Sequence, residues 1–189
     1  QNADITCSGS SALYIYKAAS VLVYLPDGTA STLTDGSSYD YGDSFSSAAD
    51  EEPNACLYSK SDLIIAGGGT LTVTGNAGNG ITGKDTLKIE DTAVSVTAAN
   101  HGINGKDCLV LKQADVTVTS GGDALRATND SDTALGCVLI GASALTLTAG
   151  EDGIQAETTL TLFDTACTVT SGGGSSAALA DGVSAKGIK

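Results

Sequence analysis

Polar residues that could bind a cation recur at one position of a repeating pattern in this chain. They stand two residues before an aliphatic residue in five segments, at Asn79, His101, Asp123, Asp152 and Asp181. If these segments stack as neighbouring strands, the polar side chains lie about 5 Å apart and face outward at one corner. Carboxylates at that distance repel one another unless a cation neutralises them. The column is therefore the first indication of a metal site.

Further oxygen donors surround this column in the sequence, some of them in an insertion in the third segment. Calcium takes roughly six to eight oxygens from carboxylates and carbonyls. We predict a calcium site made from Asp123, Asn129, Asp130, Asp132, Glu151, Asp152, Glu157 and Asp181. The alternative is a solvated acidic edge that keeps the protein soluble. That alternative is preferred for a second acidic group, Asp40, Asp43, Asp50, Glu51 and Glu52.

The elements that must position these residues follow from an internal repeat. Its aliphatic anchors are Leu57, Ile81, Ile103, Leu125, Ile154 and Val183, with spacings of 24, 22, 22, 29 and 29 residues. Within each segment, apolar residues alternate with Thr or Ser, which is typical of half-buried strands. A repeat of about 22 residues built from short strands predicts an all-β fold, a single-stranded parallel β-helix or solenoid.

The same alternation predicts which side chains fill the core. The inward residues of two successive rungs are Leu87, Ile89, Val94, Val96, Leu109, Leu111, Val116 and Val118. The glycines that precede the anchors, Gly80, Gly102, Gly153 and Gly182, are predicted to form corners, where a positive φ or the lack of a side chain is needed.

The chain is predicted to be one β-helix domain over residues 1–189. A long loop is expected at about 27–53, where Gly, Ser, Asp and Tyr accumulate. Both ends of the solenoid look truncated or uncapped, which leaves strand edges free to pair. End-to-end stacking into a homo-oligomer or an extracellular filament is therefore one alternative function.

Composition excludes several classes of partner. The net charge is −13, and the chain has no basic cluster, which argues against nucleic acid. It has no apolar run long enough to span a membrane. The chain begins at Gln1 and contains five cysteines without a zinc pattern, so we expect disulfides and a secreted or cell-surface location.

Several runs resemble a known family. Leu33–Tyr39, Ser59–Asn76 and Thr148–Thr161 are similar to the β-helical carbohydrate-binding domain of bacterial cell-surface proteins, and Thr119–Asp130 and Ser184–Lys189 look similar too. The resemblance implies a right-handed parallel β-helix related in fold to family 9 polysaccharide lyases. It also implies calcium sites and affinity for plant polysaccharides such as polygalacturonate and cellulose.

An acidic polysaccharide would need cations on the protein. Lys84 and Lys106 stand three residues after successive anchors, with Arg126 nearby in the frame. We predict that the carbohydrate-binding residues are Lys84, Lys106, Arg126 and His101, the alternative being solvated side chains at a corner. Tyr14 and Tyr16 are expected in the core rather than on a sugar-binding platform. Exposure is more plausible for the aromatic residues Tyr39, Tyr41, Phe45 and Tyr58.

Catalysis is a second alternative. A polysaccharide lyase abstracts the proton next to a uronate carboxyl group, which needs a base and a metal that acidifies that proton. Lys106 or Arg126 beside Asp123 would be the candidate base. Because such residues are common at solenoid corners, the sequence leaves enzymatic activity undecided and favours binding.

The cysteines give one geometric prediction. The runs that begin at Cys108 and Cys137 match at every apolar position, so these cysteines occupy one place on successive rungs. Their Cα atoms should be about 4.8 Å apart, which suits a disulfide. Cys167 aligns with inward positions and is expected to be a buried free thiol. Cys7 and Cys56 cannot be assigned from spacing.

Overall fold

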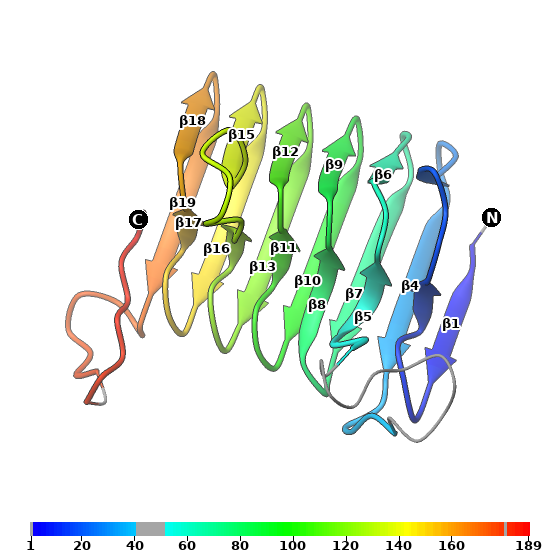
Figure 1. The fold of residues 1–189 in the computed structure, drawn as a ribbon, viewed down its shortest axis with the longest axis horizontal. Helices are drawn as coiled ribbons and strands as arrows, with labels where there is room; N and C mark the ends of the chain where they lie inside the picture. The colour runs from blue at the N-terminus through cyan, green and yellow to red at the C-terminus, as the bar shows by residue number, and fades with distance from the viewer. Residues whose placement is uncertain (1, 41–51, 180) are drawn as a thin grey trace.

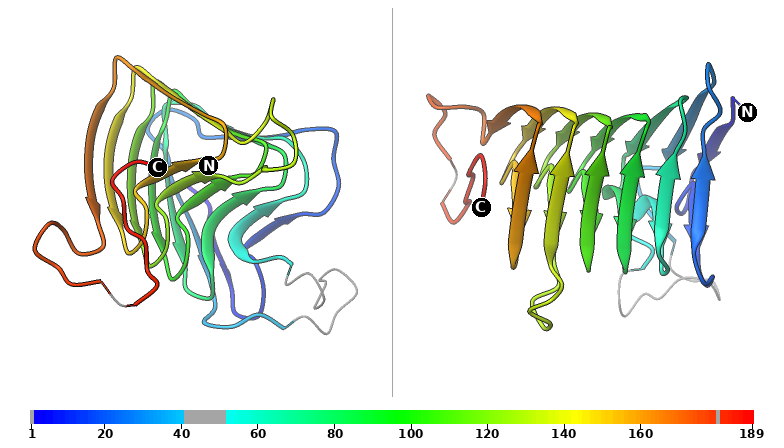
Figure 2. Two further views of the ribbon diagram at one scale, coloured as in Figure 1. Left: turned by 60° about the vertical axis from the view of Figure 1, so that its left-hand side comes forward. Right: turned by 90° about the horizontal axis from the view of Figure 1, so that it is seen from above.

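A computed structural model describes residues 2–40, 52–179 and 181–189. In these residues the chain is all-β and winds through three parallel sheets in turn, so that successive rungs stack in chain order (Figure 1). Figure 2 shows the three sheets as the walls of the solenoid, with the N- and C-terminal rungs at opposite ends. The predicted parallel β-helix is confirmed. No helix in the described part of the chain is long and apolar enough to cross a membrane.

Each sheet takes one strand from each rung. Sheet A contains β1 (Asp4–Cys7), β4 (Ala30–Asp35), β7 (Thr70–Gly75), β10 (Ala93–Ala98), β13 (Asp115–Ser120), β16 (Ala144–Ala149) and β19 (Ala166–Ser171). Sheet B contains β2 (Leu13–Ile15), β5 (Ala55–Ser59), β8 (Asn79–Gly83), β11 (Ile103–Gly105), β14 (Leu125–Ala127) and β17 (Ile154–Ala156). Sheet C contains β3 (Val21–Tyr24), β6 (Leu63–Ala66), β9 (Thr86–Glu90), β12 (Cys108–Lys112), β15 (Cys137–Gly141) and β18 (Thr159–Phe163).

The core lies inside the solenoid and is built from the alternation seen in the sequence. Every predicted inward residue of the two central rungs, from Leu87 to Val118, is at most 2% exposed. The anchor residues also stack as predicted, since Ile81, Ile103 and Leu125 pair in register across β8, β11 and β14. Stacking like residues at each rung keeps the interior continuously apolar, so each rung buries the face of the next.

Three of the four predicted corner glycines have a steric role. A Cβ would collide with Val96 at Gly80, with Val118 at Gly102 and with Val169 at Gly153. None of these three glycines has a positive φ, so the corner requires the absence of a side chain rather than left-handed backbone. Gly182 does have a positive φ of 83°, but its ideal Cβ meets no atom within 4 Å, so its turn is of a different kind.

Two boundaries differ from those predicted. β4 lies inside the expected loop at 27–53 and pairs with β1 and β7, so the excursion starts only after Asp35. The last anchor is Ile188 rather than Val183, because Ile188 forms the parallel bridge to Ile154. A glycine-rich turn that follows β19 delays the return of the chain to the stack, which spacing alone did not reveal.

Candidate functional site

The outward face of sheet B carries three adjacent columns of side chains. The central column follows the anchors by one residue and contains Tyr14, Tyr58, Thr82, Asn104, Arg126 and Gln155. Lys189 extends it, because its backbone pairs with that of β17. A second column precedes the anchors by two residues, and a third follows them by three. All four predicted carbohydrate-binding residues, Lys84, Lys106, Arg126 and His101, lie on this face.

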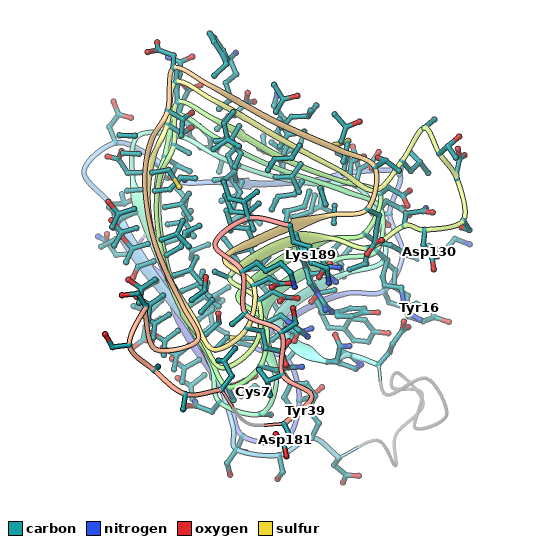
Figure 3. The ribbon with its side chains drawn as sticks, turned by 90° about the vertical axis from the view of Figure 1, so that its left-hand side faces the viewer. Cys7, Tyr16, Tyr39, Asp130, Asp181 and Lys189 are labelled. Carbon is teal, nitrogen blue, oxygen red and sulfur yellow. A yellow bond between two sulfur atoms is a disulfide. The ribbon has the colours of Figure 1, made fainter. Side chains whose placement is uncertain are left out.

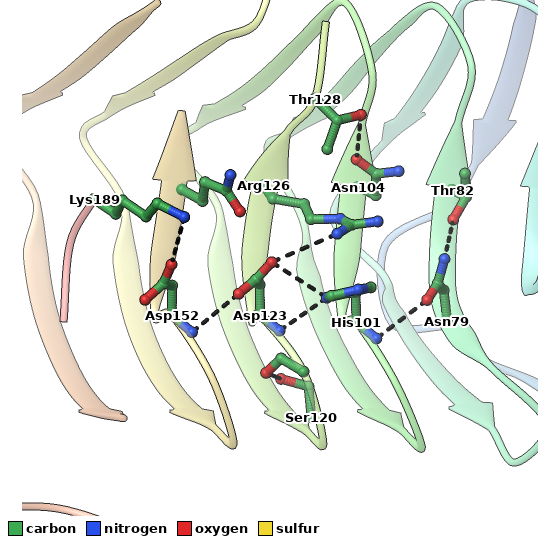
Figure 4. Close-up of polar contacts among 12 residues, drawn as sticks. Asn79, Thr82, His101, Asn104, Ser120, Asp123, Arg126, Thr128, Asp152 and Lys189 are labelled. Atoms are coloured by element: carbon green, nitrogen blue, oxygen red, sulfur yellow. Dashed lines mark hydrogen bonds and ion pairs between the residues drawn. The ribbon is translucent and has the colours of Figure 1, made fainter. Parts of the chain in front are cut away.

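The column before the anchors forms a hydrogen-bonded ladder (Figure 4). Asn79 Oδ1 accepts the N–H of His101 at 3.1 Å, and His101 Nδ1 accepts the N–H of Asp123 at 2.9 Å. Asp123 Oδ1 accepts the N–H of Asp152 at 3.0 Å, and Asp152 Oδ1 accepts the N–H of Lys186 at 2.7 Å. A backbone donor therefore stands between successive polar side chains, so the column is held without a cation between each pair.

This ladder corrects two expectations about the column. Its members do not face solvent, since Asn79, Asp123 and Asp152 are only 2–4% exposed. Asp181 does not belong to it, because the shift of the last anchor to Ile188 puts Lys186 at that position. Lys189 then provides a counter-charge, with its Nζ 3.3 Å from Asp152 Oδ2.

Asp123 is the centre of a small charged cluster. Its Oδ2 lies 3.3 Å from His101 Nδ1 and 3.6 Å from the Arg126 guanidinium. Burial by itself would raise the pKa of Asp123, but hydrogen bonds from His101 and from the Asp152 backbone, together with Arg126, outweigh it and lower the pKa. Burial also lowers the pKa of Arg126, against the opposing effect of Asp123. Asp123 is thus an ionised carboxylate in a largely desolvated place.

His101 Nδ1 has two neighbours that it cannot satisfy in the same protonation state. The neutral ring accepts the Asp123 N–H through Nδ1, which leaves the proton on Nε2. In the imidazolium form, Nδ1–H would instead donate to Asp123 Oδ2.

The predicted calcium ligands do not all converge. Among the described residues, the ligand atoms of His101, Asp123 and Glu151 lie within 4.8 Å of one another. Asn129 is buried instead in its own loop, where Oδ1 accepts the N–H groups of Ser131 and Asp132 and Nδ2 donates to Asp107. These bonds make Asn129 a structural support of the insertion, which projects from the stack in Figure 2.

The remaining predicted ligands have separate surroundings. Asp130 and Asp132 are exposed on the insertion, and Asp132 Oδ1 accepts the N–H of Ala134. Glu157 is exposed beside β17 and accepts a hydrogen bond from Gln155. Asp152 is occupied by Lys186 and Lys189. The donors that lie together are therefore two carboxylates and one imidazole.

Two lysines of the column after the anchors bind a buried carboxylate, Glu52, which comes from the segment before β5. Glu52 is 7% exposed and binds Lys60 at 2.8 Å and Lys84 at 2.6 Å. Burial opposes its ionisation, but hydrogen bonds from Lys60, Lys84 and Tyr58 lower its pKa to about 2. Glu52 was expected to be solvated. Asp43, Asp50 and Glu51 of the same predicted group lie outside the described residues.

The tyrosines of the first rungs also differ from expectation. Tyr14 and Tyr16 are on the outward face, not in the core, and Tyr16 is 57% exposed. Tyr58, which was a candidate for exposure, is fully buried. Tyr39 is half-buried and donates its hydroxyl hydrogen to Asp35 Oδ2 at 2.5 Å. The other two aromatic candidates, Tyr41 and Phe45, lie outside the described residues.

The predicted disulfide is confirmed. Cys108 and Cys137 are bonded and pair in register across β12 and β15, with Cα atoms 4.7 Å apart. Cys167 does align with the inward residue Leu145, but it is exposed, because β19 is the last strand of sheet A in the described chain and no rung covers it there. Cys56 is buried, and burial together with Asp35 raises the pKa of its thiol to about 12.

Three more residues of this face were missed in the sequence analysis. Lys60 lies in the same column as Lys84, and Lys189 lies in the same column as Arg126. Alignment by the anchors would have found Lys60. Asp85 lies above Asp107 at the corner between sheets B and C, where burial and the like charges of Asp107 and Asp62 raise its pKa. The repeated Gly-Lys-Asp at 83–85 and 105–107 was the available signal.

Comparison with known proteins gives the class to which this β-helix belongs. A family model described as carbohydrate-binding domain-containing protein matches residues 1–189, so the chain belongs to that family. A protein of the same description from Acetivibrio thermocellus is 40% identical over 95 residues, which are 50% of this chain and 32% of that protein. The match therefore spans about a third of that relative.

A solved structure is similar over nearly the whole chain. It is a polysaccharide lyase-like protein from C. thermocellum, determined as a gadolinium derivative. The TM-score is 0.75 at 29% identity, covering 97% of this chain and 74% of that one.

Proposed function

We propose that the outward face of sheet B binds an acidic plant polysaccharide, such as polygalacturonate, lying along the solenoid axis. The observation that carries this proposal is the distribution of charge. The net charge is −13, yet six of the nine cationic residues belong to this one face: Lys60, Lys84, Lys106, Arg126, Lys186 and Lys189. Acidic residues of the same face pair with four of these cations, so an anionic partner would engage the cations that remain without a carboxylate in the described part of the chain.

Lys106 is the residue best placed for a uronate carboxylate. Within the described residues, no carboxylate lies at ion-pair distance from its ammonium group, whereas Lys60, Lys84, Arg126 and Lys189 have acidic partners. It stands in the middle of the face, next to Asn104 of the central column. A charge-assisted hydrogen bond there would supply affinity that a neutral β-linked chain such as cellulose could not obtain.

The test is a binding titration with polygalacturonate and with cellulose. Lys106→Ala should weaken polygalacturonate binding about tenfold and leave cellulose binding unchanged. Lys112→Ala is the matched control, because Lys112 is exposed on β12 but lies on sheet C. Absence of polygalacturonate binding by the unchanged protein, or an equal effect of both substitutions, would refute the proposal.

Calcium is proposed as a stabilising ligand. Asp123 and Glu151 would hold it, since their carboxylates lie together with the His101 imidazole. These two residues supply only part of a calcium coordination shell. Two carboxylates offer up to about four oxygens, so backbone carbonyls and water would have to complete it.

Removal of the ion should lower stability. At a hundredfold excess over its dissociation constant, a ligand that binds only the folded state contributes about 2.7 kcal/mol. The melting temperature should therefore fall in EDTA and recover with added calcium. An unchanged melting temperature would count against the site.

A lyase activity is the second candidate function, supported by the similarity to a lyase-like structure and by the desolvated Arg126 beside Asp123. The assay is the ultraviolet absorbance of unsaturated uronate products.

A secreted or cell-surface location is likewise proposed, in keeping with the disulfide.

A further inference from the structure

The first rungs of sheet B hold an ordered aromatic cluster that the charge argument does not explain. Tyr58 is fully buried, and its ring packs edge-to-face against Tyr14 with centroids 5.6 Å apart. Tyr14 in turn packs edge-to-face against Tyr16 at 6.0 Å. The contacts run outward from the protein to a ring that is 57% exposed. Figure 3 shows Tyr16 at the periphery, on the side from which the loop of Asp130 projects.

The Tyr16 ring also has a cation–π contact with Lys60. Lys60 Nζ lies over it at 5.4 Å from the centroid, and Lys60 is itself held by Glu52 at 2.8 Å. An aromatic ring above a buried support has little rotamer freedom left to lose when it binds a ligand. Tyr24 is about equally exposed, so it is the ordered contacts of Tyr16 with Tyr14 and Lys60, rather than its exposure alone, that distinguish this ring.

We propose that Tyr16 is a stacking subsite for one pyranose ring of the polysaccharide, at the N-terminal end of the sheet B face. The inference rests on the proposed function, because it takes the same chain to lie along the same face. The apolar C–H face of the sugar would pack on the exposed ring, and the Lys60 ammonium would lie within reach of its hydroxyl or carboxylate oxygens.

The geometry sets the length of ligand that can use this subsite. Backbone hydrogen bonds place Lys60 one rung after Tyr16, then Lys84, then Lys106. Three rung steps of about 4.8 Å separate Tyr16 from Lys106 by about 14 Å. A pyranose residue is about as long as one rung is high, so a chain of roughly four sugars reaches both residues. Shorter chains reach only one of them.

The experiment is a titration of galacturonate oligosaccharides from two to six residues. The unchanged protein should gain affinity between the trimer and the pentamer, and Tyr16→Ala should lose that gain, about tenfold for the hexamer. Tyr16→Phe should keep it, because the ring remains. Tyr24→Ala is the matched control, since Tyr24 is 62% exposed but lies on β3 of sheet C.

A second measurement does not depend on removing the side chain. With tyrosine rings labelled for NMR, the Tyr16 resonances, assigned from Tyr16→Phe, should shift on addition of hexagalacturonate while those of Tyr24 do not. If Lys106→Ala weakens binding but Tyr16→Ala does not and its ring signals stay still, the subsite is refuted and the proposed function stands. If the unchanged protein binds no oligosaccharide, both are refuted.

Discussion

The outward faces of sheets A and B obey the same repeat but use it differently. Sheet A presents the same residue types rung after rung, with Thr72, Thr117 and Thr146 in one register column. These side chains are short, uncharged and exposed. Sheet B presents a different residue at nearly every rung, and several of its polar groups are buried, such as Thr82 and Asn104. The repeated residues of sheet A are what stacking of the rungs requires. The varied residues of sheet B each need a specific hydrogen-bond or ion-pair partner within the protein.

The difference separates the residues that repeat along the stack from the residues of the face that we propose for binding. A residue in an exposed, repeated column of sheet A can be substituted without leaving a buried polar group unpaired. A buried charge such as Asp123 or Glu52 must keep its particular partner, because an unpaired charge in a desolvated place is costly. The comparison therefore predicts that substitutions on sheet B have large effects and those on sheet A small ones.

The largest effect is expected for Asp123→Ala. It removes the ladder acceptor of the Asp152 N–H and leaves the Arg126 guanidinium without its counter-ion. We expect a loss of about 3 kcal/mol or more in the free energy of unfolding, measured by urea denaturation. Asp123→Asn keeps the amide-accepting oxygen and should cost less. Equal losses would show that the ladder bond contributes nothing.

Replacing both Cys108 and Cys137 with Ser should cost about 3 kcal/mol, since the bond closes a loop with a sequence separation of 29 residues. The loop includes the insertion, so its release should also loosen the Asn129 turn. Urea denaturation of the double variant measures the first effect, and hydrogen exchange at Ser131 and Asp132 the second. Unchanged exchange would separate the insertion from the disulfide.

Glu52 predicts a pH dependence with a definite sign. Its pKa is lowered in the folded protein from 4.5 to about 2. Its stabilising effect is therefore fully present above about pH 4.5 and is lost as the pH falls towards 2. Because Lys60 and Lys84 are partly exposed, solvent screening reduces the effect to about 2 kcal/mol. Glu52→Gln should remove this difference between pH 5 and pH 2, and an unaltered difference would assign it to other carboxylates.

The smallest effect is expected on sheet A. Thr117→Val keeps a β-branched side chain at an exposed strand position. The free energy of unfolding should change by no more than about 0.5 kcal/mol, and polygalacturonate affinity should not change. A larger change in affinity would move the recognition surface from sheet B to sheet A.

Much of the fold was predictable because the anchors repeat. Parallel strands in register stack equivalent residues, so alignment of the segments gave the core and the Cys108–Cys137 bond directly. The same logic would have placed Tyr14 and Tyr16 outward, one and three residues after the anchor Leu13. The prediction that Tyr14 and Tyr16 lie in the core was wrong because this least regular rung was aligned in the wrong register.

By itself, the sequence determined the period, the inward residues and the columns that share a face. Only the tertiary structure decided how those columns are satisfied. Spacing placed carboxylates about 5 Å apart and suggested repulsion, but backbone N–H groups lie between them and donate hydrogen bonds to the carboxylate oxygens. Likewise, Glu52 reaches Lys60 and Lys84 from the end of a long excursion, and the turn before Ile188 replaces Asp181 with Lys186. Periodicity encodes register along the stack, whereas contacts made by irregular segments depend on where the chain returns.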